Sequence, residues 1–311
     1  MNTKDMICVT SRSFSNNTVL KEELISVYKN VKFNTTGKSL QGADLKNFLL
    51  AGTKAIIALE PIDENLLSNL PDLKVISKYG VGLDSIDKQA LKKHNVRLGW
   101  EPGVNKRSVA ELVISFAISL VHRIPEALEV VNNGLWTQVI GNLLENKTIG
   151  IIGCGNIGQE LIHLLKPFGC RILINDIREL TDVCLELKIT QVSLDRLLME
   201  SDIISIHVPY DETTKMLLNK EKLKKVKLGA GIINLSRGGI IDENQLDKYV
   251  RDGKISGAFL DVLNDEPFIC SRLASNPKII ITPHIGGSSE EAILTMGRAA
   301  IRGLEVNHYV E

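Results

Sequence analysis

The chain has 311 residues, of which 44% are hydrophobic and 24% charged, enough for two globular domains with substantial cores. Lysine plus arginine and aspartate plus glutamate both total 37, so the net charge is zero and a nucleic-acid partner is not expected. The N-terminus has no apolar signal segment, and the longest apolar stretch (112–121) is too short to cross a bilayer, so we expect neither secretion nor a membrane partner.

The first hundred residues predict strands at MICVTS (6–11), KAIIALE (54–60) and LKVISKYG (73–80). Helical patterns surround these strands at residues 21–28, 63–70 and 85–93. This half carries no glycine-rich phosphate loop, and Pro102-Gly103 marks its end.

A single long helix is then predicted from Lys106 to Val131, with apolar residues around most of its circumference. A helix that is apolar all round must be buried, either in a core or against another subunit. We expect the second arrangement, which predicts a homodimer.

From Ile149 onward, short apolar runs alternate with helical patterns such as residues 158–169. The runs are almost continuously apolar, as expected for parallel strands that are covered on both faces. The alternation predicts an α/β fold with doubly wound parallel sheets. The predicted strands of this half are 148–153, 171–176, 202–209, 229–236, 255–263 and 278–285.

A G-x-G-x-x-G loop follows the first of these strands and precedes a predicted helix; its residues are Gly153, Cys154, Gly155, Asn156, Ile157 and Gly158. The first glycine allows a tight turn, the second lets the backbone approach a pyrophosphate, and the third lets helix and strand pack closely. The N-terminus of the helix offers free N–H groups to the phosphates. This loop predicts a dinucleotide-binding domain.

Asp176 ends the next strand, eighteen residues beyond Gly158. A carboxylate at this position can accept hydrogen bonds from both hydroxyls of the adenosine ribose and would repel a 2′-phosphate. The predicted cofactor is therefore NAD.

Three charged residues follow predicted strands at the carboxyl edge, where open α/β sheets bind ligands: Arg237, Glu266 and His284. An arginine can hold a carboxylate and polarise a carbonyl group. A histidine can supply a proton near neutral pH, and a neighbouring glutamate would raise its pKa and orient its ring. The three residues predict reduction of a 2-keto acid or oxidation of a 2-hydroxy acid.

At this point the sequence closely resembles the D-isomer-specific 2-hydroxyacid dehydrogenases, a family that includes phosphoglycerate dehydrogenase and glyoxylate/hydroxypyruvate reductase. The resemblance covers about residues 73–287, in the order and spacing of the family. The matching stretches are SKYGVGLDSID (77–87), GCGNIG (153–158), HVPYDETT (207–214), NLSRGGIIDE (234–243), AFLDVLNDEP (258–267) and TPHIGG (282–287).

The resemblance implies Arg237, Glu266 and His284 as catalytic residues, with Asp261 bound to the nicotinamide carboxamide. It also implies a flavodoxin-like substrate domain (1–101 plus 288–311), a Rossmann NAD domain (102–287), a cleft between them, and a dimer. The expected NAD contacts, besides the glycine-rich loop and Asp176, are His207, Val208, Pro209, Thr214, Leu235, Ser236, Asp261, Gly286 and Gly287.

The substrate contacts are expected from Arg237 and from the segment Lys78, Tyr79, Gly80, Val81 and Gly82, whose two glycines let backbone N–H groups converge on a carboxylate. In phosphoglycerate dehydrogenases a basic residue of this region helps to hold the substrate phosphate, and Lys78 has such a position. The preceding strand end offers Glu60 instead of a second base, which weighs against a phosphorylated substrate.

We expect a cytoplasmic enzyme without a metal site, because the five cysteines are scattered and contain no Cys-x-x-Cys pair. The predicted activity is that of a phosphoglycerate dehydrogenase of serine biosynthesis, with glyoxylate/hydroxypyruvate reductase as the alternative. Other possibilities are an NAD(H)-sensing corepressor, which can keep the same residues, and a phosphite dehydrogenase. Formate dehydrogenases of this fold usually have glutamine where Glu266 stands, which argues against that class.

Overall fold

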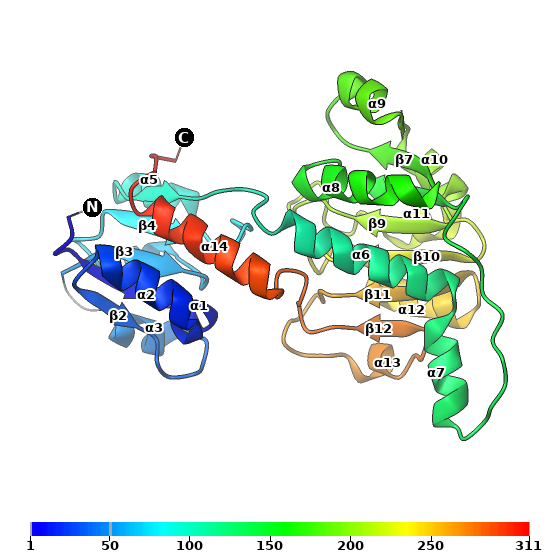
Figure 1. Ribbon diagram of the computed structural model, residues 1–311, viewed down its shortest axis with the longest axis horizontal. Helices are drawn as coiled ribbons and strands as arrows, with labels where there is room; N and C mark the ends of the chain where they lie inside the picture. The colour runs from blue at the N-terminus through cyan, green and yellow to red at the C-terminus, as the bar shows by residue number, and fades with distance from the viewer. Residues whose placement is uncertain (1, 50–51, 311) are drawn as a thin grey trace. The chain divides into compact units, whose positions relative to one another are not determined.

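The computed structural model describes residues 2–49 and 52–310, which form two compact units, each built around one parallel sheet (Figure 1). The first unit contains the chain up to Asn105 and again from Gly287 onward, and the second contains Lys106–Gly286. Helices cover both faces of each sheet. The prediction of an α/β fold with two doubly wound parallel sheets is confirmed.

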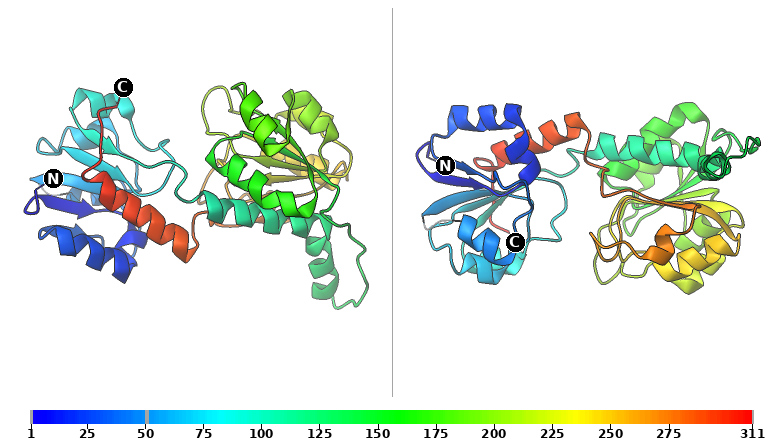
Figure 2. Two further views of the ribbon diagram at one scale, coloured as in Figure 1. Left: turned by 45° about the horizontal axis from the view of Figure 1, so that its top comes forward. Right: turned by 90° about the horizontal axis from the view of Figure 1, so that it is seen from below.

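The sheet of the first unit has five strands in the order β2-β1-β3-β4-β5. Their bounds are β1 Met6–Val9, β2 Val31–Phe33, β3 Thr53–Ala58, β4 Val75–Lys78 and β5 Arg97–Gly99. One face packs against α1 (Arg12–Asn16), α2 (Thr18–Val27) and α14 (Glu290–Gly303). The opposite face packs against α3 (Gly42–Phe48), α4 (Glu64–Leu67) and α5 (Lys88–Lys93), and Figure 2 shows both layers.

The last helix, α14, returns to the first unit and lies against α2 and the end of the sheet (Figure 2). A close approach of two glycines permits this packing, because a β-carbon at Gly99 would overlap the backbone of Gly303. The Ser77 hydroxyl also donates a hydrogen bond to the carbonyl oxygen of Ala300 at 2.6 Å. The first unit therefore combines the two ends of the chain around one core.

The sheet of the second unit has seven strands in the order β12-β11-β10-β9-β6-β7-β8. The order reverses at β6, which lies between β9 and β7, and such a switch point is where open α/β sheets bind their ligands. The bounds are β6 Thr148–Ile152, β7 Arg171–Asn175, β8 Thr190–Gln191, β9 Ile203–Ile206, β10 Ala230–Asn234, β11 Ile255–Leu260 and β12 Ile279–Ile281.

In the second unit, α6 (Lys106–Val121), α8 (Asn156–Leu165) and α9 (Thr181–Leu187) pack on one face of the sheet. A 3₁₀ turn (Lys166–Phe168) extends α8. The opposite face is covered by α10 (Leu194–Glu200), α11 (Lys220–Lys225), α12 (Glu243–Arg251) and α13 (Ser271–Ala274). The β6–α8 and β7 connections thereby bring the glycine-rich loop and Asp176 to the switch point.

The predicted single helix over 106–131 is wrong, because the chain forms two helices that are bent by 64°. After α6, Arg123 adopts a left-handed conformation (φ 55°), and Pro125 lies in the first turn of α7 (Ile124–Asn132). A left-handed residue ends a helix, and a proline is favoured at the start of the next one. One face of α6 is buried against the sheet, where Phe116 stacks on Phe259 with 4.3 Å between the ring centroids. By contrast, α7 projects away from the sheet (Figure 1).

Within residues 2–49 and 52–310, no single helix is long and apolar enough to cross a membrane. The bent pair α6 and α7 reaches the length and composition of a span only when both helices are taken together. Burial of Val113, Phe116 and Ala117 in the core accounts for the apolar character of α6. On α7, by contrast, Leu128 and Val131 are exposed.

Candidate active site

The three charged residues predicted from the sequence follow neighbouring parallel strands of the second unit. Arg237 lies beyond β10, Glu266 beyond β11 and His284 beyond β12. A β-carbon at Gly238 would overlap the carbonyl group of Leu263, so only glycine lets the loops after β10 and β11 come this close. The strand order and this contact bring the three side chains to one edge of the sheet.

His284 and Glu266 form a hydrogen-bonded pair in which Nδ1 of the imidazole lies 2.9 Å from Oε2 of the carboxylate. The second carboxylate oxygen accepts a hydrogen bond from the backbone N–H of Leu263 at 3.0 Å. His284 has a positive φ of 55°, and its N–H donates to the carbonyl oxygen of Asp261. With Nδ1 turned to Glu266, Nε2 is the nitrogen that can exchange a proton with a ligand.

The charges around this pair change the acidity of both partners. The hydrogen bond with Glu266 raises the pKa of His284 above its ordinary value, although burial and the charge of Arg237 oppose this change. Partial burial raises the pKa of Glu266, but the hydrogen bond and charge of His284 outweigh it, so the net pKa is lowered. The arrangement favours an imidazolium beside a carboxylate, which is a proton donor for a developing alkoxide.

Arg237 is held partly by its own loop. Its Nη1 donates to the carbonyl oxygen of Ser236 at 2.7 Å, and its own carbonyl oxygen accepts from Asn234 Nδ2 at 2.9 Å. The guanidinium is close enough for its charge to lower the pKa of both His284 and Glu266. A planar guanidinium beside this pair can bind both the carboxylate and the carbonyl oxygen of one small ligand.

Asp261 is 1% exposed and organises the segment that carries His284. Its carboxylate accepts hydrogen bonds from Thr282 Oγ1 at 2.6 Å and from the N–H groups of Ile285 and Gly286, both at 2.7 Å. A carboxylate has about four acceptor positions, so one remains for an amide donor. The expected hydrogen bond from a nicotinamide carboxamide would therefore go to a carboxylate that already holds residues 282–286 in place.

The glycine-rich loop has the shape that a pyrophosphate requires. A β-carbon at Gly153 (φ 91°) would lie 2.6 Å from the carbonyl oxygen of His207, and one at Gly158 would overlap the Gly153 carbonyl. By contrast, a β-carbon at Gly155 would have no neighbour within 4 Å. The first and third glycines are thus required by packing, whereas the second exposes backbone before Asn156, where α8 begins. This geometry fits a dinucleotide.

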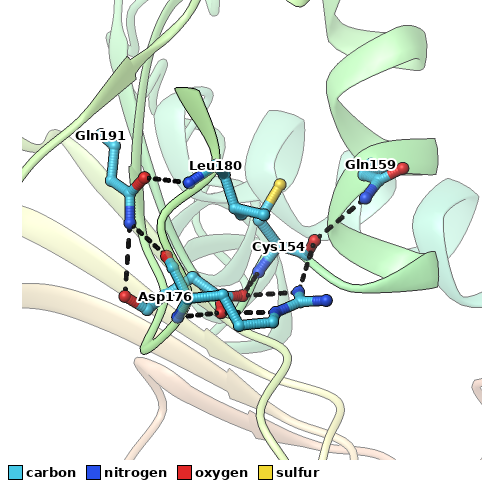
Figure 3. Close-up of polar contacts among 6 residues, drawn as sticks. Cys154, Gln159, Asp176, Leu180 and Gln191 are labelled. Atoms are coloured by element: carbon cyan, nitrogen blue, oxygen red, sulfur yellow. Dashed lines mark hydrogen bonds and ion pairs between the residues drawn. The ribbon is translucent and has the colours of Figure 1, made fainter. Parts of the chain in front are cut away.

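Asp176 lies beside this loop, directly after β7, and Figure 3 shows its surroundings. Its carboxylate accepts a hydrogen bond from the Cys154 N–H at 2.9 Å. Two nitrogens of the Arg178 guanidinium donate to the same carboxylate, at 2.9 and 3.0 Å. The hydrogen bond with Arg178 lowers the pKa of Asp176 to about 2, so the group is ionised. Arg178 was not predicted as a site residue, although a base two residues after the acid is visible in the sequence.

The segment 207–214 folds on itself next to the first glycine. His207 donates its N–H to Ile152 O, and burial lowers the pKa of its imidazole to about 4, so the ring is neutral. Thr214 Oγ1 donates to the carbonyl oxygen of Pro209 at 2.7 Å. The structure places further expected cofactor residues at the same sheet edge, after β9, β10 and β12: Val208, Leu235, Ser236 and Gly286. Gly287 opens the segment that belongs to the first unit.

In the first unit, the predicted substrate segment follows β4. Gly80 has a φ of 112°, and the N–H groups of Gly80, Val81 and Gly82 donate to no group among the residues that the structure describes. These amides remain candidates for binding an anion. The Tyr79 side chain is 3% exposed and packs edge-on against Phe14, with 5.7 Å between the ring centroids, and its N–H donates to the carbonyl oxygen of Ala58.

Lys78, the residue expected to help hold a substrate phosphate, lies at the end of β4. Its side chain is buried, with the residue 5% exposed, and the ammonium donates to the carbonyl oxygen of Leu59 at 3.0 Å and to Ser85 Oγ at 2.9 Å. The neighbouring Glu60 is also 5% exposed and accepts hydrogen bonds from Thr10 Oγ1 and from the Leu59 N–H. Both charged groups therefore hold the loop after β3, a role that no sequence motif indicated.

The sequence of the chain is similar to those of known proteins of one family. Residues 114–286 match the D-isomer specific 2-hydroxyacid dehydrogenase, NAD binding domain. A glyoxylate reductase from Thermococcus litoralis is 34% identical, over 80% of this chain and 78% of that protein. A hydroxypyruvate reductase from Thermotoga maritima is 39% identical, over 73% and 74% of the two chains. A D-3-phosphoglycerate dehydrogenase from Bacillus subtilis is 36% identical over 76% of this chain, but the match spans only 45% of that longer protein.

Solved structures show the same likeness over nearly the whole chain. A D-isomer specific 2-hydroxyacid dehydrogenase from Polaromonas sp. JS6 66 superposes with a TM-score of 0.88 and 29% identity, covering 97% of this chain and 96% of that one. A D-lactate dehydrogenase from Aquifex aeolicus, in complex with NAD and lactic acid, superposes with a TM-score of 0.82 and 28% sequence identity. The match covers 96% of this chain and 94% of that one. The similarity therefore extends over both units.

Proposed function

The chain belongs to the D-isomer-specific 2-hydroxyacid dehydrogenase family, and we propose that it reduces small, unphosphorylated 2-keto acids such as glyoxylate and hydroxypyruvate. It is an NAD-dependent oxidoreductase of the CH–OH group of D-2-hydroxy acids. The observation that supports the narrower proposal is the burial of Lys78, whose ammonium donates hydrogen bonds to Leu59 and Ser85. We assign NAD binding to the second unit, together with the catalytic residues Arg237, Glu266 and His284.

The catalytic roles follow from the contacts of the second unit. Bound NADH supplies the hydride in this reaction. Arg237 holds the carboxylate of the keto acid and polarises its carbonyl group, because its guanidinium carries a permanent charge in a planar fork. His284 gives the proton from Nε2 to the developing alkoxide, while Glu266 orients the ring and stabilises its charged form. In hydroxy-acid oxidation the same histidine accepts the proton.

The substrate preference follows from the charges at the ends of β3 and β4. To bind a substrate phosphate, a basic group must be able to leave its partners within the protein. Lys78 is buried and donates to two oxygen acceptors, which opposes such a change. A phosphate would also approach the carboxylate of Glu60, which is fixed by Thr10. A phosphoglycerate dehydrogenase of serine biosynthesis is therefore the second candidate.

Loss of NADH absorbance with different keto acids tests this proposal. We expect kcat/KM for hydroxypyruvate and glyoxylate to exceed that for phosphohydroxypyruvate by about 100-fold or more, since an unpaired charge in a site opposes binding strongly. The Lys78→Met variant should change the values for all three acids by the same factor. A preference for phosphohydroxypyruvate in the wild type, lost selectively in Lys78→Met, would instead assign the chain to the second candidate.

We also propose that the protein is a cytoplasmic homodimer, with α7 and the following loop at the subunit interface. These segments expose large apolar side chains, which commonly mark protein interfaces. The exposed fractions include 56% for Leu128, 52% for Val131, 94% for Trp136 and 84% for Ile140. The cytoplasmic location is supported by Cys154, Cys170 and Cys184, which are free thiols in the structure.

Analytical ultracentrifugation of the Leu128→Glu/Trp136→Glu double variant tests the interface. We expect the wild type to sediment with twice the mass of the chain and the double variant to sediment as a monomer, because two buried carboxylates strongly destabilise an apolar interface. Leu185→Glu is the matched control, since Leu185 is 74% exposed on α9 and should leave the dimer intact. A wild-type monomer, or a double variant that remains dimeric, would contradict the proposal.

A further inference from the structure

Asp176 is already engaged by the protein at the position where an adenosine ribose is expected. Its side chain is only 7% exposed, whereas that of Arg178 is 57% exposed. The carboxylate accepts backbone hydrogen bonds from Cys154 at 2.9 Å and from Arg178 at 3.0 Å, and the Arg178 guanidinium occupies both oxygens as well. Incoming ribose hydroxyls would therefore meet a carboxylate that is covered by a cation.

The guanidinium contacts the glycine-rich loop as well as the acid. Its Nη2 is 3.3 Å from the carbonyl oxygen of Cys154, which also accepts a hydrogen bond from Gln159 at 3.2 Å (Figure 3). Cys154 lies between the first two glycines of the loop that fits a pyrophosphate. Arg178 is thus in contact with both Asp176 and the loop at which the cofactor is expected.

The backbone that carries Arg178 is fixed by Gln191, from β8. Gln191 Nε2 donates to the carbonyl oxygen of Arg178 at 2.7 Å and to that of Asp176 at 3.4 Å, while its Oε1 accepts from the Leu180 N–H at 2.9 Å (Figure 3). The main chain after β7 therefore has a defined position. The half-exposed side chain of Arg178 can still change partners by rotation alone.

We propose that Arg178 determines cofactor choice in this chain and allows NADPH to bind nearly as well as NADH. This inference rests on the proposed binding of a dinucleotide to the second unit. A bare carboxylate would repel a 2′-phosphate, but the bidentate pair cancels most of that charge. While it remains next to Asp176, the same guanidinium can donate its other N–H groups to a 2′-phosphate. With NADH, the ribose hydroxyls replace the guanidinium on Asp176.

Isothermal titration calorimetry of the full chain with NADH and NADPH tests this role without any turnover. For the wild type we expect the two Kd values to differ by less than about tenfold, because the acid is neutralised. Arg178→Ala should weaken NADPH binding by about 10- to 100-fold, since it removes charge-assisted hydrogen bonds and uncovers the carboxylate. Its effect on NADH should stay within about threefold, as the ribose contacts of Asp176 remain.

The matched control is Arg171→Ala, because Arg171 opens the same strand β7 at its opposite end and is paired with Glu200 on the surface. That variant should bind both cofactors like the wild type. Wild-type binding of NADH with NADPH more than about 100-fold weaker would overturn the role of Arg178, as would equal losses for both cofactors in Arg178→Ala. Failure of the wild type to bind either cofactor would overturn the proposed function itself.

Discussion

Replacement of His284 by alanine is expected to lower kcat for keto-acid reduction by about 100-fold or more, because the reaction loses its proton donor. The Kd of NADH should be unchanged, since the imidazole faces Glu266 and not the glycine-rich loop. Steady-state rates with hydroxypyruvate, together with calorimetric NADH binding, measure both effects. His163→Ala is the control, because His163 is exposed on α8. Near-normal turnover of His284→Ala would exclude this histidine as the donor.

The pH dependence separates the role of Glu266 from that of a merely structural residue. Reduction needs protonated His284, so its rate falls as pH rises through the pKa of this group, which the hydrogen bond to Glu266 raises. Glu266→Gln keeps the side-chain shape but removes the charge, so the alkaline limb of the kcat/KM profile should move to lower pH. Oxidation of the hydroxy acid needs the neutral imidazole. In Glu266→Gln the acidic limb of the pH profile for oxidation should therefore also move to lower pH. An unchanged profile in Glu266→Gln would contradict this pairing.

Replacement of Arg237 by glutamine is expected to lower kcat/KM by about 100- to 1,000-fold, because a charged donor to the reacting oxygen and to the carboxylate is lost. Both a higher KM and a lower kcat should contribute, since the guanidinium contacts the bound acid and its transition state. Arg237→Lys should recover only part of the loss, because an ammonium keeps the charge but not the bidentate fork.

Arg196→Gln provides the control for Arg237. Arg196 is 52% exposed on α10 and pairs with Glu200 through an i,i+4 contact, so its removal should leave both kinetic constants unchanged. Calorimetric binding of NADH to Arg237→Gln should also match the wild type. If Arg237→Gln loses only NADH affinity and keeps its turnover at saturating cofactor, the assignment of Arg237 to the substrate is wrong.

The parallel sheets were predictable from the sequence, because strands buried on both faces are almost continuously apolar. β6, β7, β9, β10, β11 and β12 all coincide with such runs. The family was predictable as well, since its motifs occur in order, and the comparisons confirm it. β2, β5 and β8 were not predicted, because they have only two or three residues. Each of them also contains a polar residue, unlike the equally short β12, which is Ile-Ile-Ile. The break between α6 and α7 was marked by Pro125, a signal that the long apolar pattern concealed.

The polar pairings depend on the fold, and two of them, Lys78 with Leu59 and His284 with Glu266, join residues that are distant in the sequence. From the sequence alone Lys78 is a plausible phosphate ligand, but its partner Leu59 lies in the loop that follows the neighbouring strand β3. Asp176 was predicted to repel a 2′-phosphate, yet its charge is paired with Arg178. The positions of the expected catalytic residues follow from the strand order, whereas their protonation depends on contacts that only the fold reveals.

The most direct measurement is the reduction of hydroxypyruvate by NADH, with chiral chromatography of the glycerate that is formed. We expect NADH to be consumed in equal amount with the product, and the product to be D-glycerate alone. We also expect Arg237→Gln and His284→Ala to form it far more slowly. L-glycerate, a racemic product, or no consumption of NADH by a protein that binds it would contradict the proposed activity.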